Sequence, residues 1–116
     1  MAVSGTVVAT TPSNVFITYA FRFGKRNVWK IGHSQDISAR LVDVNKHVPH
    51  EVLGERCSVA WKQHWQTRMD AYEMEQLLLS ALTLRRTRER VLCTEDELQA
   101  AWIDAIRHVR QSVAAT

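Results

Sequence analysis

Hydrophobic and polar positions alternate from Asn14 to Phe23, and a period of two is typical of a β-strand. A basic turn follows at Gly24–Asn27, and Val28–Ile31 returns as the second arm of a hairpin. The sheet is therefore predicted to be antiparallel. One face of the first strand carries Val15, Ile17, Tyr19, Phe21 and Phe23, and the other face carries Phe16, Thr18, Ala20 and Arg22.

A helix from about Gln35 to Asn45 is predicted after the hairpin, because Ile37, Leu41 and Val44 recur at helical spacing. Ser34 is expected to supply its N-cap oxygen. Pro49 prevents the helix from continuing. A third strand is expected next, with one face formed by Leu53, Glu55, Cys57, Val59 and Trp61.

Two more amphipathic helices are predicted, each opening on a capping box, at Asp70–Glu73 and at Thr94–Glu97. A short strand from Arg90 to Cys93 is a further element that the pattern allows. Strands followed by helices packed on a small antiparallel sheet make an α+β fold. The apolar positions of the two helices are Ala71, Met74, Leu77, Leu78, Ala81 and Leu82, then Leu98, Trp102, Ala105, Ile106, Val109 and Val113.

Two positions indicate chemistry. Gly32 is interpreted as a turn that feeds the first helix, and Arg40 lies on the edge of the apolar stripe, so its guanidinium would emerge beside the glycine. Such an arrangement favours the binding of a phosphate group. Glu75 lies on the apolar side of its helix, where a carboxylate needs a partner cation, a metal or a solvent cleft. Simpler interpretations are a salt bridge from Arg40 to Asp36 or Asp43, and a pair between Glu75 and an arginine of the basic loop at 84–90.

Composition predicts one folded domain at 14–116 after a loosely held lead at 1–13. The chain has 116 residues, of which 46% are hydrophobic and 23% charged, and four tryptophans argue against disorder. No apolar run approaches the roughly 20 residues of a membrane span, and no signal peptide is evident, so a cytoplasmic protein is expected. Cys57 and Cys93 are expected to be buried free thiols. A net charge of +3 permits nucleic-acid binding without demanding it.

The stretch from about Asn14 to Ile106 resembles the GIY-YIG nuclease superfamily, most closely its compact branch from phages and mobile elements. Lys30-Ile31-Gly32 stands where the superfamily has Tyr-Ile-Gly, and Arg40 stands where it has its invariant arginine. Asp70-Ala-Tyr-Glu-Met-Glu75 matches a later Asp-Ala-x-x-x-Glu segment. The resemblance implies a small three-stranded antiparallel sheet flanked by helices.

The resemblance also implies a catalytic set of Tyr19, Lys30, Arg40 and Glu75 for a divalent-metal-dependent DNA endonuclease. Glu75 would bind Mg²⁺ or Mn²⁺, Arg40 would stabilise charge on the scissile phosphate, and Tyr19 or Lys30 would activate water. A second alignment places Phe16 instead of Tyr19 in the first motif. The expected nucleic-acid-binding residues are Lys25, Gly32, His33, Arg85 and Arg86.

Two departures from the family pattern keep another function open. Lys30 replaces the second tyrosine, and the late asparagine of the family has no obvious counterpart. A catalytically silent GIY-YIG-like module that binds nucleic acid or a protein is therefore the alternative, and a small phage factor that uses the fold as an interaction scaffold is another. A chain with a single domain is expected either to have low sequence specificity or to act as a homodimer.

Overall fold

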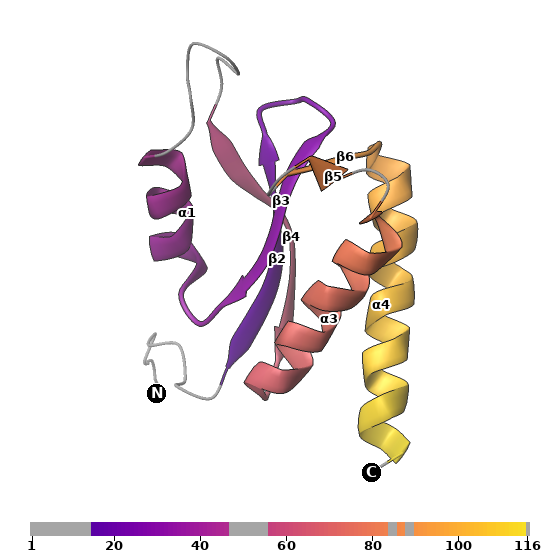
Figure 1. Cartoon of the computed structure of the whole chain (residues 1–116). Coiled ribbons are helices and arrows are strands. Elements are labelled where there is room, and N and C mark those ends of the chain that lie inside the picture. Colours follow the sequence, from indigo (N-terminus) through magenta and orange to yellow (C-terminus); the bar gives the residue numbers. More distant parts are fainter. Residues whose placement is uncertain (1–14, 47–55, 84–85, 88–89, 116) are drawn as a thin grey trace, which may run out of the picture.

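The computed structural model describes residues 15–46, 56–83, 86–87 and 90–115 (Figure 1). The expected lead at 1–13 and the expected start of the third strand at Leu53 lie outside these ranges. The elements in chain order are β2 (Phe16–Phe23), β3 (Val28–Ser34), α1 (Ile37–Lys46), β4 (Cys57–Trp65), α3 (Arg68–Ala81), β5 (Arg86–Thr87), β6 (Arg90–Leu92) and α4 (Glu95–Ala115).

The fold is α+β, as predicted, but the prediction of a three-stranded sheet is wrong. The strands are ordered β4-β2-β3-β6-β5, and every neighbouring pair is antiparallel. The additional strand β6 confirms the short strand that the pattern allowed from Arg90 to Cys93, whereas β5 has only two residues, too few to show a period of two in the sequence. Their position is set by pairing, since Val28 and Trp29 of β3 face Leu92 and Val91 of β6.

Helices cover both faces of the sheet, with α1 on one side and α3 and α4 on the other (Figure 1). On the α1 side, Tyr19, Phe21 and Phe23 pack with partly buried residues of the helix. On the other side, Ala20, Trp29 and Ile31 pack against α3 and α4. The interior strand β2 is therefore apolar on both faces. None of the helices in the described ranges is long and apolar enough to cross a membrane.

The predicted single alternation along the third strand is wrong because β4 contains an irregularity. Cys57 and Val59 pair with Phe23 and Phe21, but Trp61 pairs with Ala20, so Ala60 has no partner in β2. One extra residue moves all following side chains to the opposite face. Cys57 consequently packs on the α1 side, whereas Trp61 contacts Trp102 of α4 with ring centroids 5.8 Å apart.

Two of the predicted helix caps are also wrong. Asp36 caps α1, because its Oδ1 accepts from the Ala39 amide at 3.0 Å, while Ser34 bonds only to the Asp36 amide in front of the helix. In α3, which begins at Arg68, Thr67 Oγ1 accepts from the Asp70 amide at 3.1 Å. Asp70 is thus inside the first turn. The cap of α1 is thus two residues later than predicted and that of α3 three residues earlier, because in each case a neighbouring polar side chain accepts from the free amides.

The capping box of the last helix is confirmed. The Thr94 amide donates to Glu97 Oε1 at 2.9 Å, and the Glu97 amide donates to Thr94 Oγ1 at 3.2 Å. Both cysteines are free and buried, as predicted.

Candidate functional site

Tyr19 and Gly32 face each other in β2 and β3. The Tyr19 ring is 1% exposed, stacks on Phe21 at 4.0 Å, and places its hydroxyl over Gly32. A Cβ atom at position 32 would lie 2.7 Å from Tyr19 Cζ, closer than real contacts allow. The expected turn at Gly32 is wrong, because β3 continues to Ser34. Glycine occurs here for the close approach of a side chain.

Arg40 connects α1 to this phenol. Its Nε donates to Tyr19 Oη at 3.2 Å, and its Nη1 forms an ion pair with Asp43 Oδ2 at 3.2 Å. The ion pair with Asp43 was one of the simpler interpretations, and it coexists with the contact to Tyr19. The Arg40 side chain is 42% exposed, so a ligand in solvent can reach it.

Glu75 is paired with His33. His33 Nδ1 lies 2.7 Å from Glu75 Oε1, and the side chains are 27% and 17% exposed. Glu75 Oε2 accepts from Gln76 Nε2 at 3.3 Å. The partner that the structure gives for Glu75 is thus a β3 histidine. The pairing with an arginine of the basic loop stays a prediction, because the side chains of residues 84–89 lie outside the described part of the chain.

A buried hydrogen bond fixes α3 against the sheet near Glu75. Thr18, which is fully buried in β2, donates from Oγ1 to the Ala71 carbonyl at 2.9 Å. Ala71 is one helical turn before Glu75. This contact therefore fixes the position of α3 along the sheet, and so the point at which Glu75 meets His33.

Although α1 and α3 lie on opposite faces of the sheet, both act on Tyr19. Burial raises the pKa of Tyr19, the Arg40 hydrogen bond and charge lower it, and the Glu75 charge raises it again. The net pKa lies above the ordinary value of 10.0, so the phenol is protonated at neutral pH. The two faces can meet because β6 pairs with β3 only at Val28 and Trp29, which leaves the edge beside Gly32 without a neighbouring strand in the described ranges.

Lys30 lies beside this site, toward the hairpin. It is two residues before Gly32 on the same face of β3, which is about 7 Å along the strand. Its charge and that of Arg90 both lower the pKa of Cys57, against the dominant effect of burial, which raises it to about 11. The Arg90 guanidinium also lies over the Phe23 ring, 5.1 Å from its centroid. Lys30 and Arg90 thus place positive charge on the α1 side of the sheet.

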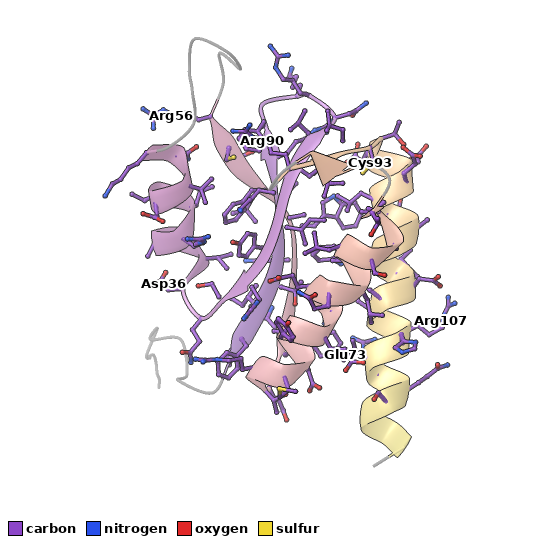
Figure 2. All side chains as sticks on the ribbon, viewed as in Figure 1. Asp36, Arg56, Glu73, Arg90, Cys93 and Arg107 are labelled. Atoms are coloured by element: carbon purple, nitrogen blue, oxygen red, sulfur yellow. The ribbon has the colours of Figure 1, made fainter. Side chains whose placement is uncertain are left out.

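The structure does not bring every expected residue to this site. Lys25 is exposed in the β2–β3 turn, at least five residues along the hairpin from Gly32, which is about 17 Å. Figure 2 shows Arg56 and Arg90 at that same end of the molecule. Arg85 lies outside the described residues, and Arg86 belongs to β5. Phe16, the alternative to Tyr19, packs against the core on the side of α3, with Arg68 over its ring.

The sequence interpretation missed the pairing of His33 with Glu75 and the position of Tyr72. The Tyr72 ring contacts His33 edge to face, with centroids 5.8 Å apart. A signal was present, because His33 alternates with Trp29 and Ile31 and therefore points to the side that α3 covers.

Within the described ranges, no cluster of three or more histidine, cysteine or acidic side chains is placed to hold a metal ion. Glu75 is the one carboxylate among the described residues that shift the Tyr19 pKa. Magnesium commonly binds through one or two carboxylates, with waters and substrate phosphates as its other ligands. A single partly exposed glutamate is compatible with that donor set.

Comparisons of the chain with family models, with curated proteins and with solved structures give no match.

Proposed function

We propose that this chain hydrolyses phosphodiester bonds in nucleic acid, with DNA as the first substrate to test, in the manner of a GIY-YIG nuclease. One arrangement supports the proposal: Gly32 and Arg40, from two different elements, contact the Tyr19 phenol, and the charge of Glu75 on a third element raises the pKa of that phenol. These residues are the ones that the sequence resemblance selects.

Arg40 is proposed to bind the scissile phosphate. Tyr19 and Asp43 hold its Nε and one terminal nitrogen, and the side chain is 42% exposed. A guanidinium fixed in this way meets phosphate oxygens without further ordering. It would stabilise the negative charge that increases at phosphorus during attack.

Tyr19 is proposed to act as a protonated phenol. Its hydroxyl oxygen accepts from Arg40, and its raised pKa keeps the proton in place. The O–H group is then available to orient the attacking water or a phosphate oxygen. Removal of a proton from water falls to Lys30, as the sequence suggested, or to His33, whose Nδ1 is oriented by Glu75.

Glu75 is proposed to hold Mg²⁺ or Mn²⁺ when substrate is bound. Its carboxylate is 17% exposed and offers the hard oxygen donors that these ions prefer. A bound ion would supply positive charge that polarises a phosphate oxygen. The chain itself holds α3, and with it this carboxylate, in a fixed position along the sheet through the hydrogen bond from Thr18 to the Ala71 carbonyl.

Lys30 and Arg90 are proposed to contact the nucleic-acid backbone on the way to the site, and Lys25 to contact it at the hairpin turn. Such contacts position a strand without reading its sequence. A plot of the logarithm of the binding constant against the logarithm of the salt concentration has a slope that reports the number of phosphate contacts. Each contact that is lost should reduce the magnitude of this slope by about one.

The experiment compares two neighbouring glutamates. Purified protein is incubated with single-stranded, duplex and branched DNA in Mg²⁺. We expect wild type and Glu73→Gln to cleave, and Glu75→Gln and Arg40→Ala to lose at least about 100-fold in rate. Glu73 is the matched control because it belongs to the same helix and has no contact with His33 among the described hydrogen bonds. Equal rates in all four proteins would refute the mechanism.

A silent nucleic-acid-binding module is the second candidate. It is favoured by the state of Glu75, whose two oxygens already accept from His33 and Gln76. Binding to DNA without turnover in Mg²⁺, Mn²⁺ and Ca²⁺ would select this function, provided that the protein is folded by circular dichroism.

A further inference from the structure

We propose that Tyr72 is a stacking platform for an unpaired base next to the scissile phosphate, so that the preferred ligand is single-stranded nucleic acid. This inference rests on the proposed function and names the substrate class of the same site. It depends on four features of α3: the direction of Tyr72, its exposure, its neighbours and the direction of the nearby carboxylates.

Tyr72 lies on the side of α3 that borders the site. At about 100° per residue, it is roughly 60° from Glu75 around the helix, and both lie beyond the buried stripe of Ala71, Met74 and Leu78. Tyr72 is three residues before Glu75, so the two side chains are neighbours on the helix surface. A base stacked on this ring would place its own phosphate near the Glu75 carboxylate.

The ring is exposed although most large apolar side chains of this protein are buried. Tyr72 is 46% exposed, and Met69, one turn earlier, is 73% exposed. Tyr19, the second tyrosine, is 1% exposed. Tyr72 is therefore not needed to fill the core, and its exposed surface is available to a flat ligand.

The neighbours of Tyr72 suit a nucleotide. His33 meets the ring at an interplanar angle of 76°, which fixes the ring on one side without stacking on it. Arg68, four residues before Tyr72, is exposed and lies over Phe16 at 5.5 Å, so it adds a positive charge to the same surface. Arginine planes and aromatic rings are the side chains on which unstacked bases rest.

The two carboxylates next to Tyr72 in sequence other than Glu75, those of Glu73 and Asp70, turn away from this surface. Glu73 is about 100° and Asp70 about 160° from Tyr72 around the helix. The phosphate of a stacked nucleotide would therefore approach Arg68 without facing those two acids.

An unpaired base is required because the faces of paired bases are covered by their neighbours in a duplex. A base can reach Tyr72 only if it is single-stranded, at an end, or turned out of the helix. Since every base has an aromatic face, stacking of this kind tolerates any sequence.

The test measures binding in chelator, so that no cleavage occurs. A labelled 12-nucleotide single strand and a hairpin duplex of the same composition are titrated with the full chain by fluorescence anisotropy. We expect tighter binding of the single strand, a loss of about tenfold or more in single-strand affinity for Tyr72→Ala, and a change of less than about threefold for Tyr72→Phe. Ile103→Ala, at an exposed apolar position of α4, is the matched control and should leave both affinities unchanged.

An abasic ligand separates stacking from a general loss of structure. A single strand that lacks bases has nothing to stack, so wild type and Tyr72→Ala should bind it equally. If Tyr72→Ala binds all ligands like wild type, or loses affinity for the abasic strand and the duplex by the same factor, the platform is refuted. Cleavage in Mg²⁺ by a protein with that result would leave the proposed nuclease function intact. A loss confined to the single strand, in a protein that cleaves nothing, would support the platform and refute the nuclease.

Discussion

The hydroxyl of Tyr19 lies over the backbone of Gly32, so close that position 32 has no room for a side chain. The contact joins β2 to β3 at the place where Arg40 reaches the phenol. The stability of the sheet and the geometry of the candidate site therefore depend on the same pair.

Gly32→Ala is expected to lower the free energy of unfolding by about 1–3 kcal/mol, because an overpacked core must shift. The Tyr19 ring cannot swing away easily, since it stacks on Phe21 at 4.0 Å. Urea unfolding measures the cost. In a Tyr19→Ala background the same substitution should cost much less, and an equal cost in both backgrounds would contradict the contact.

Tyr19→Phe removes the acceptor for Arg40 Nε while keeping the ring. We expect a loss of about 0.5–1.5 kcal/mol in stability, since the bond is only partly buried. A double-mutant cycle with Arg40→Met should give a coupling energy of similar size. Strict additivity of the two substitutions would indicate that the hydrogen bond contributes nothing in solution.

Thr18→Val should destabilise the protein by about 1–3 kcal/mol, because it removes a fully buried hydrogen bond to the Ala71 carbonyl. Thr18→Ser keeps the hydroxyl and is the control. If cleavage is observed in wild type, Thr18→Val should also reduce its rate at temperatures where it is fully folded, since α3 carries Glu75. An unchanged rate would show that the position of α3 does not depend on this bond.

The stability of the protein should fall between about pH 9 and 11 because of Cys57. Burial raises the pKa of this thiol from 9.0 to about 11, so the unfolded chain releases its proton first. The stability contributed by the neutral thiol is present below pH 9 and is lost as pH rises toward 11, by about 2–3 kcal/mol. The comparison of wild type with Cys57→Ala in urea at pH 8, 9, 10 and 11 isolates this loss. Parallel pH profiles would contradict it.

Asp36→Ala should cost about 1 kcal/mol, whereas Ser34→Ala should cost less, because Asp36 is the side chain that accepts from the first turn of α1. Thermal unfolding of the two variants measures the difference. A larger loss of stability for Ser34→Ala than for Asp36→Ala would show that Ser34, the residue that the sequence favoured, is the N-cap.

The amphipathic patterns of the sequence were sufficient for the larger elements. The hairpin, the three helices and the α+β class are present as predicted, since a period of two or of 3.6 reports which faces will be buried. The caps of α1 and α3, the irregularity in β4 and the two-residue strand β5 were not predictable in this way, whereas β6 falls within the short strand that the pattern allowed at Arg90–Cys93. The caps, the irregularity and β5 depend on which of several nearby polar groups or backbone segments finds a partner in the folded chain.

The sequence by itself determined that Gly32, Arg40 and Glu75 were unusual residues, because a glycine directly after a run of strand-forming residues, a cation beside an apolar stripe and a carboxylate within an apolar stripe each stand out from their local pattern. Only the tertiary structure decided that Tyr19 rather than Phe16 faces Gly32, and that His33 is the partner of Glu75. The physical reason is register. Cross-strand and helix-to-sheet contacts join residues 13 and 42 positions apart, and local periodicity contains no information about such distances.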